Sequence, residues 1–96
     1  MALYIVLANW TDQGIRNIKD SPDRLDKARA LAKKHGCEFR QFHLTIGTAD
    51  MVVMIEAPSD EAMASFALAL GSAGNIRTTT LKALSEDAYR KIVGGL

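Results

Sequence analysis

Hydrophobic residues along the chain fall into four short runs, and two longer segments between them have helical spacing. The short runs have the length and the β-branched and aromatic content of strands. They cover residues 3–9, 37–46, 51–57 and 76–84. The apolar stripe of a first helix consists of Leu25, Ala28, Leu31 and Ala32. An alanine-rich segment after the third run predicts a second helix. The expected order is strand, helix, strand, strand, helix, strand.

Capping residues mark where the helices begin and end. We expect Ser21 to be the N-cap of the first helix, with Pro22 at its first helical position. Gly36 is expected to end that helix in the left-handed conformation. Ser59 predicts the start of the second helix, and Ser85 predicts the start of a short helix after the last strand. The chain is therefore expected to be an α+β protein of the ferredoxin-like βαββαβ plan with a short C-terminal helix.

The second and third runs predict a hairpin whose turn is Gly47–Asp50. Strand residues whose numbers sum to 97 should then face each other. This pairing places Leu44 opposite Val53 on an apolar face, which we expect beneath the helices. It places His43 opposite Met54 on a face of mixed polarity.

The two strands expected in the middle of the sheet, the first and the third, are apolar on both faces. We expect Tyr4, Val6, Val52 and Met54 to point away from the helices. Two helices can cover only one face of the sheet, so these residues would form an exposed apolar patch of the kind that marks an interface. A chain of this size is also marginally stable alone. A homo-oligomer, in which a second copy covers the patch, is the simplest expectation.

Length, charge and cysteine content indicate the number of domains, the kinds of partner and the cellular compartment to expect. The 96 residues fit one domain spanning residues 1–96. Twelve basic and eleven acidic residues give a net charge of +1, which predicts neither a nucleic-acid nor a membrane partner. A lone cysteine, Cys37, favours a reducing compartment, and the apolar run Ala2–Ala8 is too short to span a membrane. We therefore expect a cytoplasmic protein.

Four segments resemble the GYD domain family, in order and over essentially the whole chain. They are Asn9–Gly14, Lys19–Pro22, Phe66–Gly71 and Gly74–Thr78. The resemblance implies a dimeric α/β barrel, in which two ferredoxin-like sheets pack face to face. The namesake motif differs here, because Gly47-Thr48-Ala49-Asp50 has alanine where the family has tyrosine. The resemblance implies the fold more specifically than the function.

Four residues are candidates for ligand binding: Asn9, Trp10, Asp50 and Arg77. Trp10 could form the wall of an apolar pocket, with Asn9 as a polar neighbour, or it could pack under the loop that follows it. Asp50 is the best candidate for a catalytic acid or base, although aspartate in a turn commonly bonds to nearby backbone amides. Arg77 could bind an anion, or it could pair with Asp50 or with a carboxylate of a partner subunit.

The remaining reactive side chains predict no further site. With the pairing given above, His43 lies roughly 13 Å from Asp50 along the strands, too far for a catalytic pair. Cys37 is expected to be a small strand residue. No spacing of Cys, His and Asp is typical of a metal site, and no cofactor is expected.

These observations favour a homo-oligomeric module that binds a small apolar or carboxylate-bearing ligand in a cleft beside the sheet. Two alternatives stay open. One is a cofactor-independent isomerase or monooxygenase that acts on a small organic compound. The other is a structural or regulatory oligomer whose interface is its function.

Overall fold

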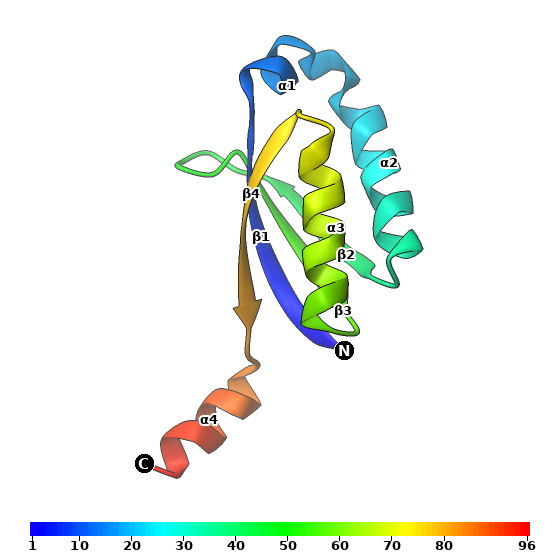
Figure 1. Cartoon of the computed structure of the whole chain (residues 1–96). Coiled ribbons are helices and arrows are strands. Elements are labelled where there is room, and N and C mark those ends of the chain that lie inside the picture. The colour runs from blue at the N-terminus through cyan, green and yellow to red at the C-terminus, as the bar shows by residue number, and fades with distance from the viewer.

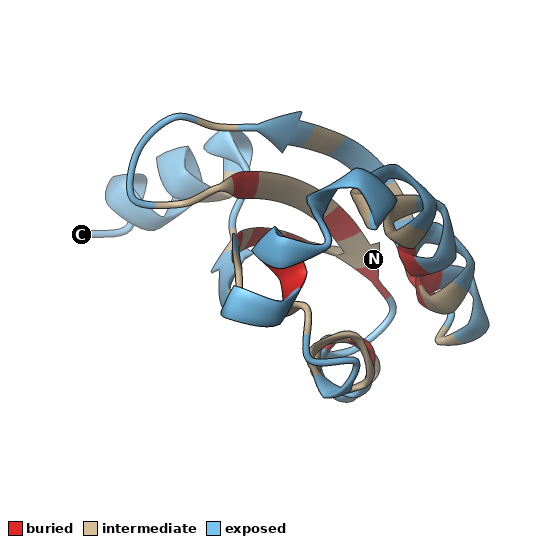
Figure 2. Ribbon diagram, turned by 90° about the horizontal axis from the view of Figure 1, so that it is seen from above, coloured by how far each residue is buried: buried red, intermediate tan, exposed pale blue.

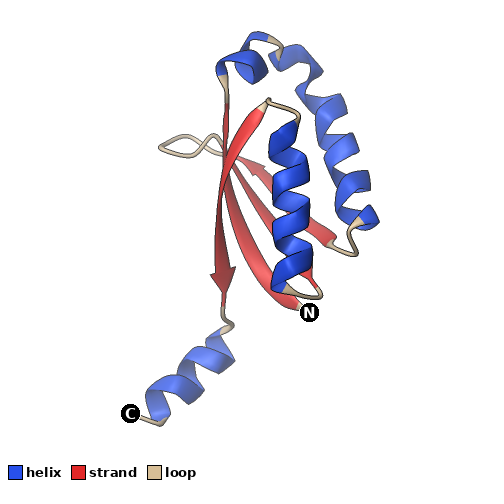
Figure 3. Cartoon of the chain, viewed as in Figure 1, coloured by secondary structure: helices blue, strands red, loops and turns tan.

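The structure, a computed structural model, describes all 96 residues as four strands and four α-helices (Figure 1). In chain order the elements are β1 (Ala2–Trp10), α1 (Asp12–Arg16), the 3-10 helix η1 (Ile18–Asp20), α2 (Ser21–Lys34), β2 (Glu38–Leu44), β3 (Met51–Ala57), α3 (Asp60–Ser72), β4 (Ile76–Ala83) and α4 (Glu86–Gly94). The strands form one antiparallel sheet in the order β2-β3-β1-β4. Helices α2 and α3 lie on the same face of this sheet (Figure 3). The architecture is ferredoxin-like, as the sequence predicts.

The predicted caps of the later helices are confirmed. The Ser59 hydroxyl oxygen accepts a hydrogen bond of 3.1 Å from the backbone N–H of Ala62, and Ser85 accepts one of the same length from Ala88. Each bond satisfies an amide that the first helical turn leaves without a partner. Gly36 has φ of +74° directly after α2, which confirms the predicted left-handed end.

The prediction that Ser21 caps α2 is wrong by one residue. The helix begins at Ser21, and the N-cap position belongs to Asp20, whose side chain forms no capping bond. The reason is the short 3-10 helix η1, which runs straight into α2, so that the backbone at Asp20 is already helical with ψ of −5°. A continuous helical backbone replaces the expected side-chain cap.

The predicted pairing of the hairpin is also wrong, by two residues. Leu44 lies opposite Met51 and His43 opposite Val52, because the loop extends over the six residues Thr45–Asp50. The backbone N–H of Thr45 donates to the Asp50 carbonyl at 2.8 Å, which closes this longer loop. A shift of two residues keeps every side chain on its expected face. His43 is nearer to Asp50 along the strand than expected, and its ring contacts Gln41 at 3.4 Å.

The faces of β1 are the reverse of the prediction. Tyr4 and Val6 pair with Ile55 and Val53 and lie beneath the helices, whereas the other side of β1 faces away from them. Because β1 is apolar on both sides, its hydropathy could not decide between the two orientations. The Tyr4 hydroxyl provides the physical reason, since it donates a hydrogen bond to Asp60 at the start of α3.

The sheet surface away from α2 and α3, here called the open face, is apolar at its centre. No helix covers it (Figure 1). The apolar centre of the open face consists of Leu3, Ile5, Leu7, Val52, Met54 and Leu81. Leu81 retains 47% of its surface exposed. The apolar patch predicted on this face is therefore present, although β1 contributes a different set of residues to it.

Helix α4 extends beyond the end of β4, away from the sheet (Figure 1). It makes no substantial contact with any other element, and none of its residues is buried (Figure 2). Its apolar side chains Tyr89, Ile92 and Val93 are all exposed. The projecting helix helps to lengthen the molecule to 49 × 30 × 17 Å.

Only 12 of the 96 residues are buried, and the main core cluster fills one end of the space between sheet and helices. Its largest fully buried side chains are Phe66 of α3 and Ile55 of β3. At the opposite end, the segment Thr11–Gly14 lies against the turn Ala73–Asn75, an arrangement here called the turn contact. The Thr11 N–H donates to the Asn75 carbonyl at 3.0 Å, and the Thr11 hydroxyl donates to the Gly74 carbonyl at 2.6 Å.

Gly14 is the closest point of the turn contact. A Cβ at this position would lie 2.9 Å from the Asn75 carbonyl carbon and closer still to its oxygen. Both partners are backbone, so neither can move aside as the end of a side chain can. We expect Gly14→Ala to destabilise the protein by about 2 kcal/mol or more, as overpacked sites do.

Gly71→Ala is the matched control, because a Cβ at Gly71 meets no atom within 4 Å. Its expected effect is an increase in the free energy of unfolding of up to about 1 kcal/mol, since alanine favours helix over glycine. Urea denaturation of both variants measures the two changes. Equal stabilities for Gly14→Ala and the native protein would show that the turn contact does not constrain the fold.

Candidate functional site

The end of the interlayer space that the core cluster leaves unfilled is a cleft of about 340 Å³. It lies between the helix-covered face of the sheet and helices α2 and α3. Sixteen of its 20 lining residues are hydrophobic. They are Val6, Ala8, Trp10, Leu25, Ala28, Leu31, Phe39, Phe42, Met51, Val53, Ile55, Phe66, Ala69, Leu70, Ala73 and Ile76.

Small side chains on facing elements leave this space open. Ala8 lies on the sheet, Ala28 lies on α2, Ala69 lies on α3, and Ala73 directly follows α3. Larger apolar residues at these positions would extend the packed core across the layer. Because alanine contributes little volume, the side chains at these positions do not fill the space between the layers.

Trp10 is the predicted ligand-binding residue that lines the cleft. It is the last residue of β1 and lies opposite Ile76 on the helix-covered side of the sheet. The indole therefore forms a wall of the cleft at the end where the turn contact lies. This position agrees with the expectation that Trp10 could form the wall of an apolar pocket.

Asn9 and Asp50 do not line the cleft. The Asp50 carboxylate accepts a hydrogen bond of 3.0 Å from the backbone N–H of Trp10. The Asp50 N–H in turn donates to the Asn9 side-chain oxygen at 2.8 Å and to the Ala8 carbonyl at 3.0 Å. These bonds join the hairpin loop to the end of β1, the structural role that aspartate commonly has in turns.

Arg77 lies opposite Asn9 in the pairing of β1 with β4, and it is exposed. Arg77 forms no ion pair within the chain. The ion pair with Asp50, one of the roles that the sequence left open for Arg77, is therefore absent. The structure thus gathers Asn9, Asp50 and Arg77 near one end of the open face. It separates them from the indole of Trp10, which lies on the other side of the sheet.

The lining of the cleft also contains two cations, Arg24 and Lys27 of α2. Neither of them was predicted from the sequence as a site residue. The Arg24 guanidinium donates hydrogen bonds to the carbonyls of Asn17 at 3.0 Å and Gly14 at 3.1 Å. Their spacing of three residues beside the apolar stripe of α2 is the signal that could have identified them. No residue that lines the cleft is acidic.

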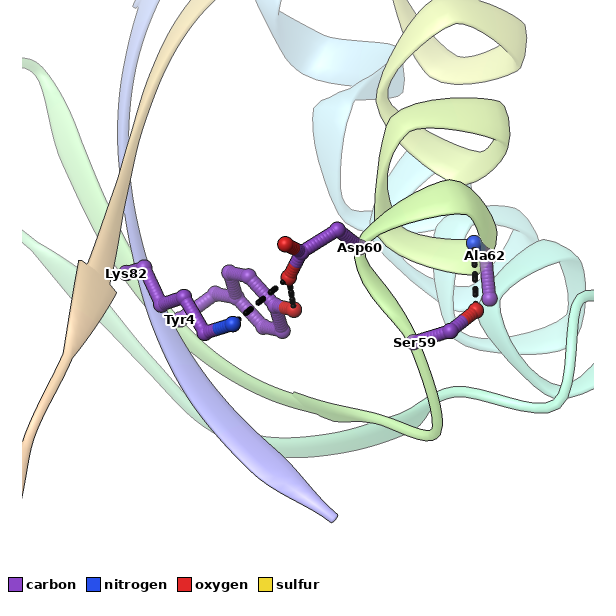
Figure 4. A network of polar contacts seen from close by, with 5 residues as sticks. All are labelled: Tyr4, Ser59, Asp60, Ala62 and Lys82. Carbon is purple, nitrogen blue, oxygen red and sulfur yellow. Dashed lines mark hydrogen bonds and ion pairs between the residues drawn. The ribbon is translucent and has the colours of Figure 1, made fainter.

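A second polar cluster lies outside the cleft, between the start of α3 and the edge of the sheet (Figure 4). The Tyr4 hydroxyl donates to the Asp60 carboxylate, and the Lys82 ammonium lies 2.9 Å from the same oxygen. The hydrogen bond to Asp60 raises the pKa of Tyr4, and the bonds from Tyr4 and then Lys82 lower the pKa of Asp60. A tyrosine with a raised pKa is a weak candidate for proton abstraction at neutral pH.

The other reactive groups form no site. Cys37 is buried in the core directly before β2, and burial raises the pKa of its thiol, which disfavours the reactive thiolate. The structure has no group of three or more His, Cys, Asp or Glu side chains placed to hold a metal ion. None of its helices combines the length and the hydropathy needed to span a bilayer.

The chain is similar to a protein family, to a named protein and to a solved structure. The family model described as the GYD domain matches residues 4–93. A Thermus thermophilus protein named "Glutamine synthetase and cystathionine beta-lyase binding protein" is 29% identical over 85 residues, which are 88% of this chain and 90% of that protein. The crystal structure of MtbAldR matches with a TM-score of 0.67 and 14% identity, over 88% of this chain and 52% of that one. The chain therefore spans about half of that solved chain, and the likeness shows the fold alone.

The cluster around Asp60 is expected to make stability depend on pH at both extremes. The pKa of Asp60 is lowered by folding, so its contribution is complete above its ordinary value of 3.8 and is lost as the pH falls through that value to the lower folded one. The pKa values of Tyr4 and Lys82 are raised by folding from 10.0 and 10.5. Their contributions are complete below those ordinary values and are lost as the pH rises through the higher folded ones.

Asp60→Asn should therefore cost most stability at neutral pH, and less below about pH 4 and above about pH 10. Urea denaturation across this range measures the difference from the native protein. Asp26→Asn is the control, because Asp26 is exposed and belongs to no ion pair. If the cost of Asp60→Asn were the same at every pH, the carboxylate would have no charge-dependent role in the cluster.

Proposed function

The chain belongs to the GYD domain family, and from that premise we propose that it is a homo-oligomeric module that binds a small, mainly apolar molecule in the cleft. The proposal rests on the volume and the lining of the cleft. Its volume of about 340 Å³ falls in the range of small-molecule pockets. Its lining is also typical of such pockets, since a few polar groups interrupt a largely apolar wall.

The chemistry of the lining supports binding more than acid–base catalysis. The charged side chains that line the cleft are Arg24 and Lys27, and neither aspartate, glutamate, histidine nor cysteine lines it. A general acid or base must reach the proton that it transfers. Asp50, the best candidate for that role by sequence, lies outside the lining, and its carboxylate is bonded to the Trp10 backbone. An isomerase or monooxygenase is therefore the less supported alternative.

The open face supports self-association. Its apolar centre has no cover within the chain, and exposed patches of this kind are usually interfaces. Two copies related by a twofold axis could each cover the open face of the other, because such an interface uses the same patch twice. The cleft lies on the opposite side of the sheet, so this arrangement would leave it accessible.

Binding to another protein is the second candidate. The projecting helix α4 favours it, since its exposed Tyr89, Ile92 and Val93 have no partner within the chain. The name of the Thermus thermophilus relative points the same way, because that protein is named for binding other proteins. The two candidates are compatible, since α4 does not line the cleft.

Val52→Asp tests the oligomer. Val52 lies on the open face opposite Leu7, so each copy in a face-to-face dimer would bury an unpaired carboxylate. We expect the dissociation constant to rise by at least about 100-fold. Native mass spectrometry over a dilution series measures it. Ser65→Asp, an exposed position on α3, is the charge-matched control and should assemble normally.

Unchanged assembly of Val52→Asp would exclude the open face as the contact. A native protein that is monomeric at all concentrations would exclude the oligomer itself. Either result leaves the cleft proposal intact, because the cleft lies on the other side of the sheet.

Ala69→Phe tests the cleft. Ala69 lines it from α3, so a phenyl ring there would occupy part of the space. The neutral fluorophore N-phenyl-1-naphthylamine is a suitable probe, because its emission rises in apolar surroundings. We expect one saturable site per chain, weakened about tenfold or more by Ala69→Phe.

Ala64→Phe is the matched control, since Ala64 is exposed on α3 and does not line the cleft. It should change the affinity for the fluorophore by less than about twofold. Equal loss of binding in both variants, or no effect of Ala69→Phe, would mean that the fluorophore binds elsewhere. A native protein without saturable binding would contradict a small-molecule role for the cleft.

A further inference from the structure

We propose that the molecule bound in the cleft is an apolar monocarboxylate, whose hydrocarbon body lies among the apolar lining and whose carboxylate binds Arg24. This inference rests on the proposed function and specifies the chemical class of the ligand. Arg24 would then bind the anion, a role that the sequence had suggested as one alternative for Arg77.

The charged side chains in the cleft all have the same sign. Arg24 and Lys27 are its charged lining residues, and both are positive. The ion pairs of the chain involve other cations, at Arg40, Lys82 and Arg90. A ligand with one negative group would therefore meet two cations that no carboxylate of the chain neutralises.

Arg24 is already held in place by hydrogen bonds. Its bonds to the carbonyls of Gly14 and Asn17 use two of the five N–H donors of a guanidinium. Both acceptors are neutral, so they fix the side chain without cancelling its charge. The remaining donors can form the paired bonds that arginine makes with a carboxylate.

The surroundings of Arg24 favour a strong bond to an anion. Its side chain is half-buried, and it lines the same cleft as Trp10 and Leu25. A charge-assisted bond at a partly buried site is stronger than one in open water, because the local dielectric is lower. The Ser21 hydroxyl and the Asn75 side-chain amide also belong to the lining, and each could donate a further bond to the carboxylate.

Acidic residues near the start of α2 do not cancel this arrangement. Asp20 and Asp23 are exposed, and neither forms an ion pair with Arg24 or Lys27. Neither lines the cleft. Their fields act mainly through water, where screening by salt reduces them over about 10 Å.

The test compares octanoate with octanamide, which have the same hydrocarbon chain and differ in charge. Isothermal titration calorimetry on the intact protein should show octanoate binding about tenfold more tightly than octanamide. Arg24→Gln should reduce this ratio to about twofold or less, mainly by weakening octanoate, with Lys27 as the cation that remains in the lining. Arg24→Lys should keep part of the preference, because a point charge replaces the planar fork.

Arg16→Gln is the matched control, since Arg16 is exposed in the last turn of α1 and does not line the cleft. It should leave the ratio unchanged. Equal affinity of the native protein for octanoate and octanamide would overturn the carboxylate inference and leave the cleft as a binding site for neutral molecules. An undiminished preference in a folded Arg24→Gln protein would overturn the role of Arg24.

Two further results complete the test. If Arg24→Gln did not fold, the comparison of the two probes on the native protein and on Arg24→Lys would still decide the inference. If neither probe bound the native protein, and the neutral fluorophore did not bind either, the proposed function would fail together with the inference.

Discussion

The contact between the turn after β1 and the turn before β4 is the constraint on which the rest of the site depends. Gly14 allows two backbone segments to approach more closely than any side chain would permit, and Thr11 fixes the approach with two hydrogen bonds. The contact holds α1 at one end of the interlayer space. Because α1 supplies the Gly14 carbonyl that holds Arg24, a backbone approach at Asn75 sets the position of a cation in the cleft.

A second constraint is that the helices packed on the sheet are too few to cover both of its faces. Two helices cover one face of four strands, and their inward side chains fill the space between the layers at one end only. The core therefore concentrates around Phe66 and Ile55, and the cleft forms where alanines face one another. Because no further helix packs on the sheet, the open face and α4 have no packing partner within the chain. Cleft and open face are thus two consequences of a small core, on opposite sides of one sheet.

The sequence predicted local features better than it predicted orientation. The boundaries of β3 and the caps at Ser59 and Ser85 are correct, because each depends on a few neighbouring residues. The orientation of β1 was wrong because both of its sides are apolar, and only the long-range bond from Tyr4 to Asp60 distinguishes them. A cleft beside the sheet was expected, but its place and size could not be predicted, since they depend on how far α2 lies from the sheet. Arg24 was missed because its position beside the apolar stripe of α2 gains meaning only once the cleft is located.

The hairpin loop connects the two groups of residues that the sheet separates. Its Gly47-Thr48-Ala49-Asp50 motif lacks the family's tyrosine, yet the Asp50 carboxylate still binds the backbone N–H of Trp10. That bond fixes the backbone of the residue whose indole forms a wall of the cleft. Asp50 can therefore influence the cleft without lining it, through the position of Trp10. On this basis the link between the loop and the wall of the cleft depends on the aspartate and its acceptor oxygen, and it does not depend on an aromatic ring at position 49.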